Sequence, residues 1–271
     1  MTYKLVALDI DGTVRTPTHP VTGHTRRVIA AVEETGAVVT IATGRSYRSA
    51  ANQARILGIS SPIVSFQGAH LADPNTGEVH WHQPLTPDLA RKTLDAFDSD
   101  DFPGDVMAYQ GHEIFVKEMT EWINAYSGRN EVTVNAVGDL NSIAEQSPTR
   151  FVAVGDPNDI EGLESRLLAK FDSTLHITRS LPQFCEVLHP DAGKHKALAE
   201  YCVRLGIRPE QVVVIGNGYN DVHMLEWAGL GVATADAVPQ ALAVADRVTA
   251  RVQEDGVAQL LDELLQNGLF S

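Results

Sequence analysis

Two carboxylates near the N-terminus are the first residues whose types and spacing suggest chemistry. Asp9 and Asp11 follow the apolar residues 5–8, which predict a short buried strand closed by a Gly-Thr turn. Because side chains two positions apart leave a strand on the same side, both acids should project from its carboxyl end. Ligands bind at that end in open α/β sheets, and two acids held together there repel unless a cation or a shared proton intervenes. The pair therefore predicts a site for acid–base or metal chemistry.

A calcium-binding loop does not explain the pair. Such a loop has a glycine at its sixth position and a glutamate at its twelfth. Counted from Asp9, the glycine is the fourth residue, Gly12, and the twelfth is Pro20. The spacing excludes a calcium loop of this kind.

Two later polar turns also follow predicted strands. Residues 37–42 form an apolar run that leads into the Thr-Gly-Arg sequence at 43–45, and the strongly apolar residues 212–215 lead into the turn 216–221. The carboxyl ends of neighbouring parallel strands lie side by side. The side chains expected to converge there are those of Asp9, Asp11, Thr43, Asn217, Asn220 and Asp221.

The elements around these turns predict an α/β fold with a Rossmann-like parallel-sheet core. Helices are expected over residues 25–35, 46–57 and 194–205, and they alternate with strands over short connections. This alternation favours a parallel sheet with right-handed crossovers, in which residues 63–66 would be the third strand. A turn at residues 74–77 predicts a hairpin.

The middle of the chain has a different pattern of predicted secondary structure. Residues 84–188 contain turn-rich, strand-like pieces with helices between them, and the regular alternation returns only after residue 188. We therefore predict a discontinuous core, residues 1–83 and 189–271, with residues 84–188 inserted as an α+β domain.

Composition limits the classes of function. The formal net charge of −14 argues against a general nucleic-acid-binding surface, although a local site can still bind an anionic small molecule. The two cysteines, Cys185 and Cys202, are too few for a disulfide framework and favour a reducing cytoplasm. No apolar run approaches the roughly 18 residues needed to span a membrane. We expect a soluble cytoplasmic protein that binds neither nucleic acid nor membrane.

In this order, the motifs resemble those of the haloacid dehalogenase-like hydrolase superfamily, in its Cof-like branch with an α/β cap domain inserted between the second and third motifs. The sequence DIDGT at 9–13 matches the first motif and TGR at 43–45 the second. The third, a lysine in a K-G-x-A-L setting, matches residues 194–198 except that His195 replaces glycine. The fourth, GDxxND followed by Met-Leu, matches residues 216–221 and 224–225.

The resemblance implies hydrolysis of a phosphate ester through a phospho-aspartate. Asp9 would attack phosphorus, and Asp11 would protonate the leaving alcohol and then deprotonate water. Lys194 would add positive charge. Lys196 competes for this role, but the two point about 200° apart around a helix of ~3.6 residues per turn, so only one can face the site, and the following Ala197-Leu198 selects Lys194. The resemblance assigns the phosphate to Thr43, Gly44, Arg45 and Asn220. It assigns Mg²⁺ to Asp9, Asp11, Asn217 and Asp221.

A second departure from the family pattern affects the expected metal site. Asn217 stands where an aspartate is usual, and a carboxamide oxygen can ligate Mg²⁺ but brings no negative charge. We therefore expect weaker metal binding at an otherwise intact site. The favoured function is a Mg²⁺-dependent phosphatase of a small phosphorylated metabolite, with sugar phosphates first and nucleotide or cofactor phosphates next. The alternatives are a phosphomutase or phosphotransferase, and a phosphate-ester binding protein with an impaired site.

Overall fold

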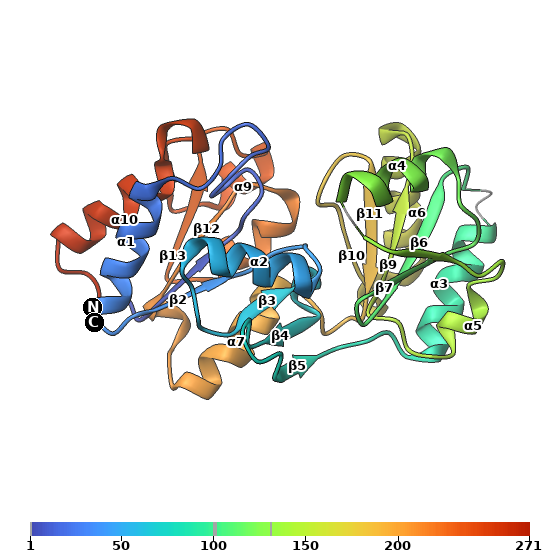
Figure 1. Cartoon of the computed structure of the whole chain (residues 1–271), viewed down its shortest axis with the longest axis horizontal. Helices are drawn as coiled ribbons and strands as arrows, with labels where there is room; N and C mark the ends of the chain where they lie inside the picture. The colour runs from blue at the N-terminus through green and yellow to red at the C-terminus, as the bar shows by residue number, and fades with distance from the viewer. Residues whose placement is uncertain (1, 100–101, 131) are drawn as a thin grey trace. The chain divides into compact units, whose positions relative to one another are not determined.

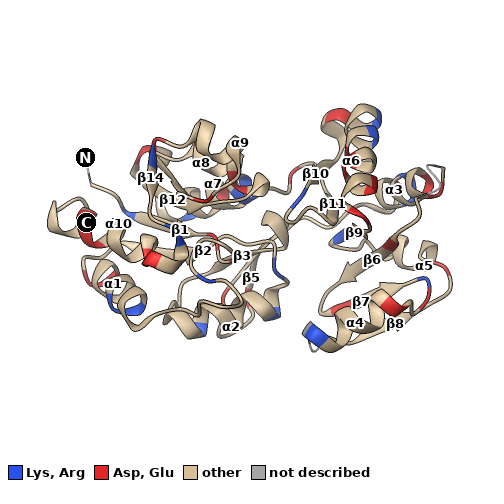
Figure 2. Cartoon of the chain, turned by 90° about the horizontal axis from the view of Figure 1, so that it is seen from above, with Lys and Arg blue, Asp and Glu red and all other residues tan. Residues whose placement is uncertain are grey.

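A computed structural model describes residues 2–99, 102–130 and 132–271 of the chain (Figure 1). The chain forms two compact units. Unit 1 consists of Met1–His82 and Gly193–Ser271, and unit 2 of Gln83–Ala192. Acidic and basic residues are interspersed over the helices and loops of both units (Figure 2). None of the helices in the described ranges is long and apolar enough to cross a membrane.

Unit 1 is built on a five-stranded parallel sheet in the order β14-β13-β12-β1-β2. The strands are β1 (Leu5–Leu8), β2 (Val38–Ile41), β12 (Val212–Gly216), β13 (Leu230–Thr234) and β14 (Arg247–Thr249). The register pairs Leu8 of β1 with Ile41 of β2 and with Ile215 of β12. Because the three adjacent strands β12, β1 and β2 end at nearly the same level, the polar turns that follow them lie at the same edge of the sheet.

Helices cover both faces of this sheet. The helices are α1 (Gly23–Glu34), α2 (Tyr47–Leu57), α7 (Lys194–Leu205), α8 (Val222–Trp227), α9 (Pro239–Val244) and α10 (Gly256–Gln266). Val6 and Leu8 of β1 pack into a core with residues of α1, α2 and α10. Leu5 and Ala7, on the opposite face, pack with residues of α7, α8 and α9. The continuous apolar run of β1 therefore reflects a strand buried on both sides.

The third predicted strand lies outside the parallel sheet. β3 (Ile63–Ser65), β4 (His70–Ala72) and β5 (Val79–His82) form an antiparallel sheet of their own, and one parallel bridge, Ala42–Val64, joins its first strand to the end of β2. The short 3₁₀ helix η1 (Phe66–Gly68) explains the difference. Its three residues have positive φ angles of 49°, 56° and 91°, which turn the chain back immediately so that β3 pairs with β4. The hairpin expected at residues 74–77 connects β4 to β5.

Unit 2 has a six-stranded sheet in the order β10-β11-β9-β6-β7-β8. The strands are β6 (Asp105–Gln110), β7 (Glu113–Val116), β8 (Val134–Ala136), β9 (Arg150–Val154), β10 (His176–Thr178) and β11 (Phe184–Leu188). Its helices are α3 (Pro87–Ser99), α4 (Glu121–Asn130), α5 (Asn141–Ala144) and α6 (Pro157–Phe171). All its strand pairs are antiparallel except β7–β8, and residues of α3, α5 and α6 share its core. The structure thus confirms the predicted fold class, a parallel-sheet α/β core combined with α+β elements.

Candidate active site

A buried ion triad occupies the edge of the sheet where the strands end. The ammonium of Lys194, the first residue of α7, donates to Asp9 Oδ1 at 2.7 Å and to Asp221 Oδ1 at 2.6 Å. Only 2% of Lys194, 5% of Asp9 and none of Asp221 is exposed. Lys196, by contrast, lies exposed on the other side of the helix. The fold therefore places one lysine between two carboxylates from the turns that follow β1 and β12, which are neighbouring strands.

Burial changes the acidity of this triad. Burial, and next the charge of Asp221, raise the pKa of Asp9 to about 7 against the lowering effect of Lys194. Burial alone would lower the pKa of Lys194, but the carboxylates of Asp221 and Asp9 raise it above its ordinary value. Lys194 is therefore charged at neutral pH, and its positive charge keeps the pKa of Asp9 from rising further.

The carboxylate of Asp221 also shapes the turn that follows β12. Its Oδ2 accepts the backbone N–H groups of Asn217 and Gly218, both at 2.8 Å. Both carboxylate oxygens of Asp221 are thus engaged, one by the lysine and one by the turn. A side chain at Gly216 would approach this carboxyl group within 2.7 Å, which explains the glycine at the start of the turn.

Asp11 is oriented by a different cation. Arg45 donates through Nε to Asp11 Oδ2 at 2.6 Å and through Nη2 to Oδ1 at 2.7 Å, a bidentate pair. The remaining guanidinium nitrogen of Arg45, Nη1, donates to Ser49 Oγ at 2.8 Å. The Asp11 side chain is 52% exposed, in contrast to the buried Asp9. The two acids therefore have separate partners and separate environments.

The side-chain amide of Asn217 lies against the first turn. Its end that faces the site is 2.9 Å from Thr13 Oγ1, 3.1 Å from the carbonyl oxygen of Asp11 and 3.2 Å from Asp9 Oδ2. Thr13 Oγ1 also donates to Asp9 Oδ2 at 3.2 Å. Thr13 was not among the predicted site residues, although it stands inside the first motif and its hydroxyl joins Asp9 to Asn217.

The oxygen atoms of Asn217, Asp9 and the Asp11 carbonyl have spacings that suit a metal ion. Mg²⁺ takes oxygen ligands at about 2.0–2.1 Å in octahedral geometry, so adjacent ligand oxygens lie roughly 3 Å apart. The spacings of 3.1 and 3.2 Å around Asn217 match this when its amide oxygen faces Asp9 Oδ2 and the Asp11 carbonyl. No cluster of three His, Cys, Asp or Glu residues in the described ranges forms a metal site. A cation here would therefore depend on the amide and carbonyl oxygens as well as on Asp9.

The predicted phosphate-binding residues form a second hydrogen-bonded group. Thr43 Oγ1 accepts the backbone N–H of Arg45 at 3.3 Å, and the carbonyl of Thr43 accepts the N–H of Gln67 at 3.1 Å. Asn220 donates its side-chain amide to Gln67 Oε1 at 2.9 Å. A side chain at Gly44 would meet the Gln67 amide within 2.3 Å. Gln67 therefore links the turn after β2 to the turn after β12.

Sequence reasoning missed Gln67 as part of the site. The residue is buried at 1% exposure in the η1 turn, the fourth polar turn that follows a strand of unit 1. A side chain at Gly68 would collide with the backbone of Gly193, so the two glycines allow η1 to approach the start of α7. The signal in the sequence was the Gln-Gly pair directly after residues 63–66.

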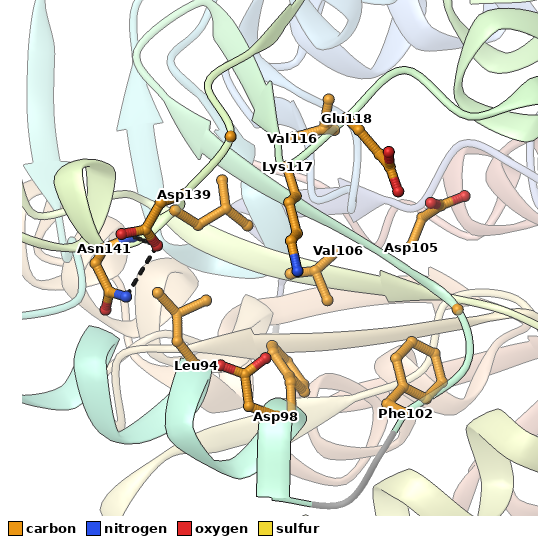
Figure 3. A pocket seen from close by; sticks show the side chains of 14 residues that line it. Leu94, Asp98, Phe102, Asp105, Val106, Val116, Lys117, Glu118, Asp139 and Asn141 are labelled. Atoms are coloured by element: carbon orange, nitrogen blue, oxygen red, sulfur yellow. Dashed lines mark hydrogen bonds between the residues drawn. The ribbon is translucent and has the colours of Figure 1, made fainter.

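Unit 2 contains a cavity of about 280 Å³ (Figure 3). It is lined by residues of α3, β6 and β7 and by the segment around Asp139 and Asn141, whose side chains hydrogen-bond at 2.9 Å. Every predicted site residue lies in unit 1, so this cavity is not the predicted site. Elsewhere in unit 2, Arg150 forms a buried ion pair with Glu186 and lies 4.4 Å over the ring of Tyr109.

The chain is similar to known proteins over most of its length. A family model described as haloacid dehalogenase-like hydrolase matches residues 6–261. The chain is 28% identical over 264 residues to a 5-amino-6-(5-phospho-D-ribitylamino)uracil phosphatase of Bacillus subtilis, covering 96% of each chain. It is 28% identical over 243 residues to an HMP-PP phosphatase of Enterobacter sp., covering 89% of this chain and 87% of that one.

The fold is also similar to that of solved structures. The fold matches a phosphatase of the haloalkanoate enzyme superfamily from Bacteroides thetaiotaomicron with a TM-score of 0.83 and 25% identity, covering 97% of this chain and 95% of that chain. By its family and its relatives, the chain is an enzyme of the phosphoric monoester hydrolase class. The match over almost its full length places it among the haloacid dehalogenase-like hydrolases, in the Cof-like branch.

Proposed function

We propose that the chain hydrolyses a small phosphorylated metabolite, with a sugar phosphate as the first choice, through a phospho-aspartate on Asp9 and with Mg²⁺. The observation that carries this proposal is the different setting of the two acids. Asp9 is buried against Lys194, whereas Asp11 is half-exposed and held by Arg45. A nucleophile and an acid–base group need such different environments.

Asp9 is the nucleophile. One carboxylate oxygen forms a bond to phosphorus while the ester oxygen leaves, so one difficult displacement becomes two easier ones. The ammonium of Lys194, 2.7 Å from Asp9 Oδ1, offsets negative charge that accumulates when a phosphate approaches the carboxylate. Asp221 holds Lys194 in place and closes the turn at 217–218, so we assign it a positioning role rather than direct metal binding.

Asp11 exchanges protons with the leaving group and with water. It donates a proton to the departing alcohol, and in the second step it accepts a proton from the water that attacks the phospho-aspartate. Its bidentate pair with Arg45 fixes the orientation of the carboxylate before substrate binds. Arg45 lies one residue after Gly44, and we propose that it also contacts the substrate.

The phosphate is bound at the turns after β2 and β12. We assign its oxygens to the hydroxyl of Thr43, the backbone of Gly44 and the amide of Asn220. Gln67 Oε1 accepts one N–H of Asn220 and so sets the direction of the other. This role makes Gln67 a positioning residue of the proposed site.

Phosphatases of this superfamily are generally metal-dependent. We propose Mg²⁺ as the metal, held by Asp9 Oδ2, the carbonyl oxygen of Asp11 and the side-chain oxygen of Asn217. When bound, it neutralises charge between the nucleophile and the phosphate. This set of ligands is smaller than the one expected from the sequence, because the Asp11 carboxylate binds Arg45 and both carboxylate oxygens of Asp221 already accept from other donors.

The choice of substrate class rests on the relatives and on unit 2. The names of two relatives specify a phosphorylated ribityl compound and HMP-PP, both small phosphorylated molecules. We propose that unit 2, predicted as residues 84–188, is the cap domain that selects the leaving group. Both cysteines are free and buried thiols, which supports the cytoplasm as the compartment.

A phosphate-release screen over phosphorylated metabolites, with and without Mg²⁺, tests the proposal. Asp9→Asn is the blank because it keeps the size of the side chain and removes the nucleophile. We expect release from at least one sugar phosphate that requires both Asp9 and Mg²⁺. Equal release by the blank would refute the phospho-aspartate, and transfer to a sugar acceptor faster than release of phosphate would indicate a phosphotransferase.

Asn217 favours one second candidate, a protein that binds phosphate esters without turnover. In that case calorimetry would detect binding of phosphorylated ligands while release stays at the level of the Asp9→Asn blank. The same screen therefore separates the two functions.

A further inference from the structure

One of the two terminal atoms of the Asn217 side-chain amide, oxygen or nitrogen, points at Asp9 and the first turn. The atom at that end lies near one hydroxyl, Thr13 Oγ1, and near two acceptors, Oδ2 of the ionised Asp9 and the Asp11 carbonyl. With oxygen at this end, three acceptors face one another and Thr13 alone donates. With nitrogen there, the two N–H groups of the amide have three acceptors within reach, the Asp11 carbonyl at 3.1 Å, Asp9 Oδ2 at 3.2 Å and Thr13 Oγ1 at 2.9 Å. The hydrogen-bonding network therefore selects the nitrogen for the protein without a cation.

The first turn is shaped to bring the amide this close. Gly12 has a φ of +86°, and a side chain there would lie 2.2 Å from the Asn217 amide. The absence of that side chain lets the amide pack directly on the backbone of the turn. Asn217 thus reaches the Asp11 carbonyl and Asp9 from the turn after β12, the strand that pairs with β1.

We propose that Asn217 acts as a built-in substitute for the cation: its N–H groups bind Asp9 Oδ2 and the Asp11 carbonyl, and a metal ion must displace them. The proposal rests on the proposed function for the identity of the metal, Mg²⁺. An ionised aspartate at this position has no donor, so it would leave three acceptors facing one another until a cation arrived. An asparagine satisfies the same groups by itself.

Two consequences follow for binding and stability. Binding of the cation requires the side-chain amide of Asn217 to flip, because its oxygen must replace its nitrogen beside Asp9 and the Asp11 carbonyl. The cation affinity is therefore lowered by lost hydrogen bonds in addition to the lost negative charge. The cation-free protein, in turn, is more stable with Asn217 than with an aspartate, whose unpaired acceptors would be partly buried.

Asn217→Asp tests both consequences. Calorimetric titration with MgCl₂ should show binding to the variant roughly tenfold or more tighter than to the wild type, because ligand charge sets affinity. Without a cation, the variant should unfold at a lower temperature than the wild type, and saturating Mg²⁺ should remove this deficit. Asn52→Asp, which adds the same charge on the exposed face of α2, should bind Mg²⁺ within about twofold of the wild type. A cation-free variant as stable as the wild type, or one that binds Mg²⁺ no more tightly, would overturn the proposal.

A direct measurement on the wild type does not depend on how the variant folds. The ¹⁵N-labelled side-chain amide of Asn217, assigned by its loss in Asn217→Ala, should be protected from hydrogen exchange in EDTA. Saturating Mg²⁺ should shift its resonance and remove the protection. An amide that exchanges rapidly in EDTA, or one that stays protected with Mg²⁺ bound, would contradict the substitution. None of these measurements uses phosphate release, so a failure of the proposed hydrolysis would be seen separately.

Discussion

The ammonium of Lys194 lies 2.6 Å from Asp221 Oδ1, as close as it lies to Asp9. The lysine is therefore part of the buried structure of unit 1 as well as a source of charge for the proposed chemistry. Asp221 in turn accepts two backbone N–H groups of the turn after β12. Loss of one member leaves buried charge that the remaining partners compensate only in part, and breaking a buried ion pair in this way is costly.

The first prediction concerns the stability of this triad. Lys194→Met should lower the free energy of unfolding by about 3–5 kcal/mol, because two buried carboxylates lose their common cation. Urea unfolding followed by circular dichroism measures the change. Lys196→Met, two residues along the same helix and exposed, is the matched control and should change stability by less than about 0.5 kcal/mol. Equal stability of the two variants would show that the triad contributes nothing.

The second prediction concerns the pair between Arg45 and Asp11. Arg45→Lys keeps the charge but cannot bind both carboxylate oxygens in the planar bidentate geometry. We expect kcat/KM to fall roughly tenfold to a hundredfold, because the acid–base group loses its fixed orientation. Stability should change by less than about 1 kcal/mol, since the Asp11 side chain is 52% exposed. Unchanged steady-state kinetics would remove Arg45 from the mechanism.

The third prediction tests Gln67 as the residue that orients Asn220. Gln67→Met keeps a long side chain and removes the oxygen that accepts from Asn220. We expect KM for the phosphate ester to rise about fivefold, the equivalent of one hydrogen bond of about 1 kcal/mol, with a smaller effect on kcat. Gln53→Met, at another buried glutamine of unit 1, is the control and should leave KM unchanged. A fall in kcat at constant KM would contradict a role in phosphate binding.

The strand–helix pattern predicted the parallel core because local signals and burial agree there. The helix expected over residues 194–205 has the same bounds in the structure, Lys194–Leu205, and its left-handed C-terminal residue is Gly206. The run at 5–8 is apolar throughout because β1 is covered on both faces. The separate β3–β4–β5 sheet could not be predicted in the same way. It depends on left-handed backbone at Phe66 and Gln67, residues that rarely adopt it.

The motifs predicted which turns carry polar side chains, but not how these side chains pair. Asp9 and Asp11 were expected to project together, since residues i and i+2 of a strand share a side. β1 ends at Leu8, however, and the turn after it gives the two acids different partners. The links made by Thr13 and Gln67 depend on contacts between distant segments. Such contacts leave no periodic signal in one sequence.

The last prediction uses His195, which stands where the third motif of the family has glycine. Burial, and then the charges of His223 and Lys196, lower the pKa of His195 to about 4. In the unfolded chain a histidine titrates near 6.5, so between about pH 6.5 and 4 the unfolded state binds more protons than the folded one. The contribution of His195 to stability is therefore present above pH 6.5 and is lost as the pH falls toward 4.

His195→Gln should remove this dependence, because glutamine does not titrate. Relative to its own value at pH 7.5, the free energy of unfolding of the variant at pH 4 should fall by about 1–2 kcal/mol less than that of the wild type. Urea unfolding at a series of pH values measures this difference. His19→Gln, at an exposed histidine, controls for the loss of one imidazole. Parallel pH curves for His195→Gln and the wild type would show that His195 is protonated equally in the folded and unfolded chains.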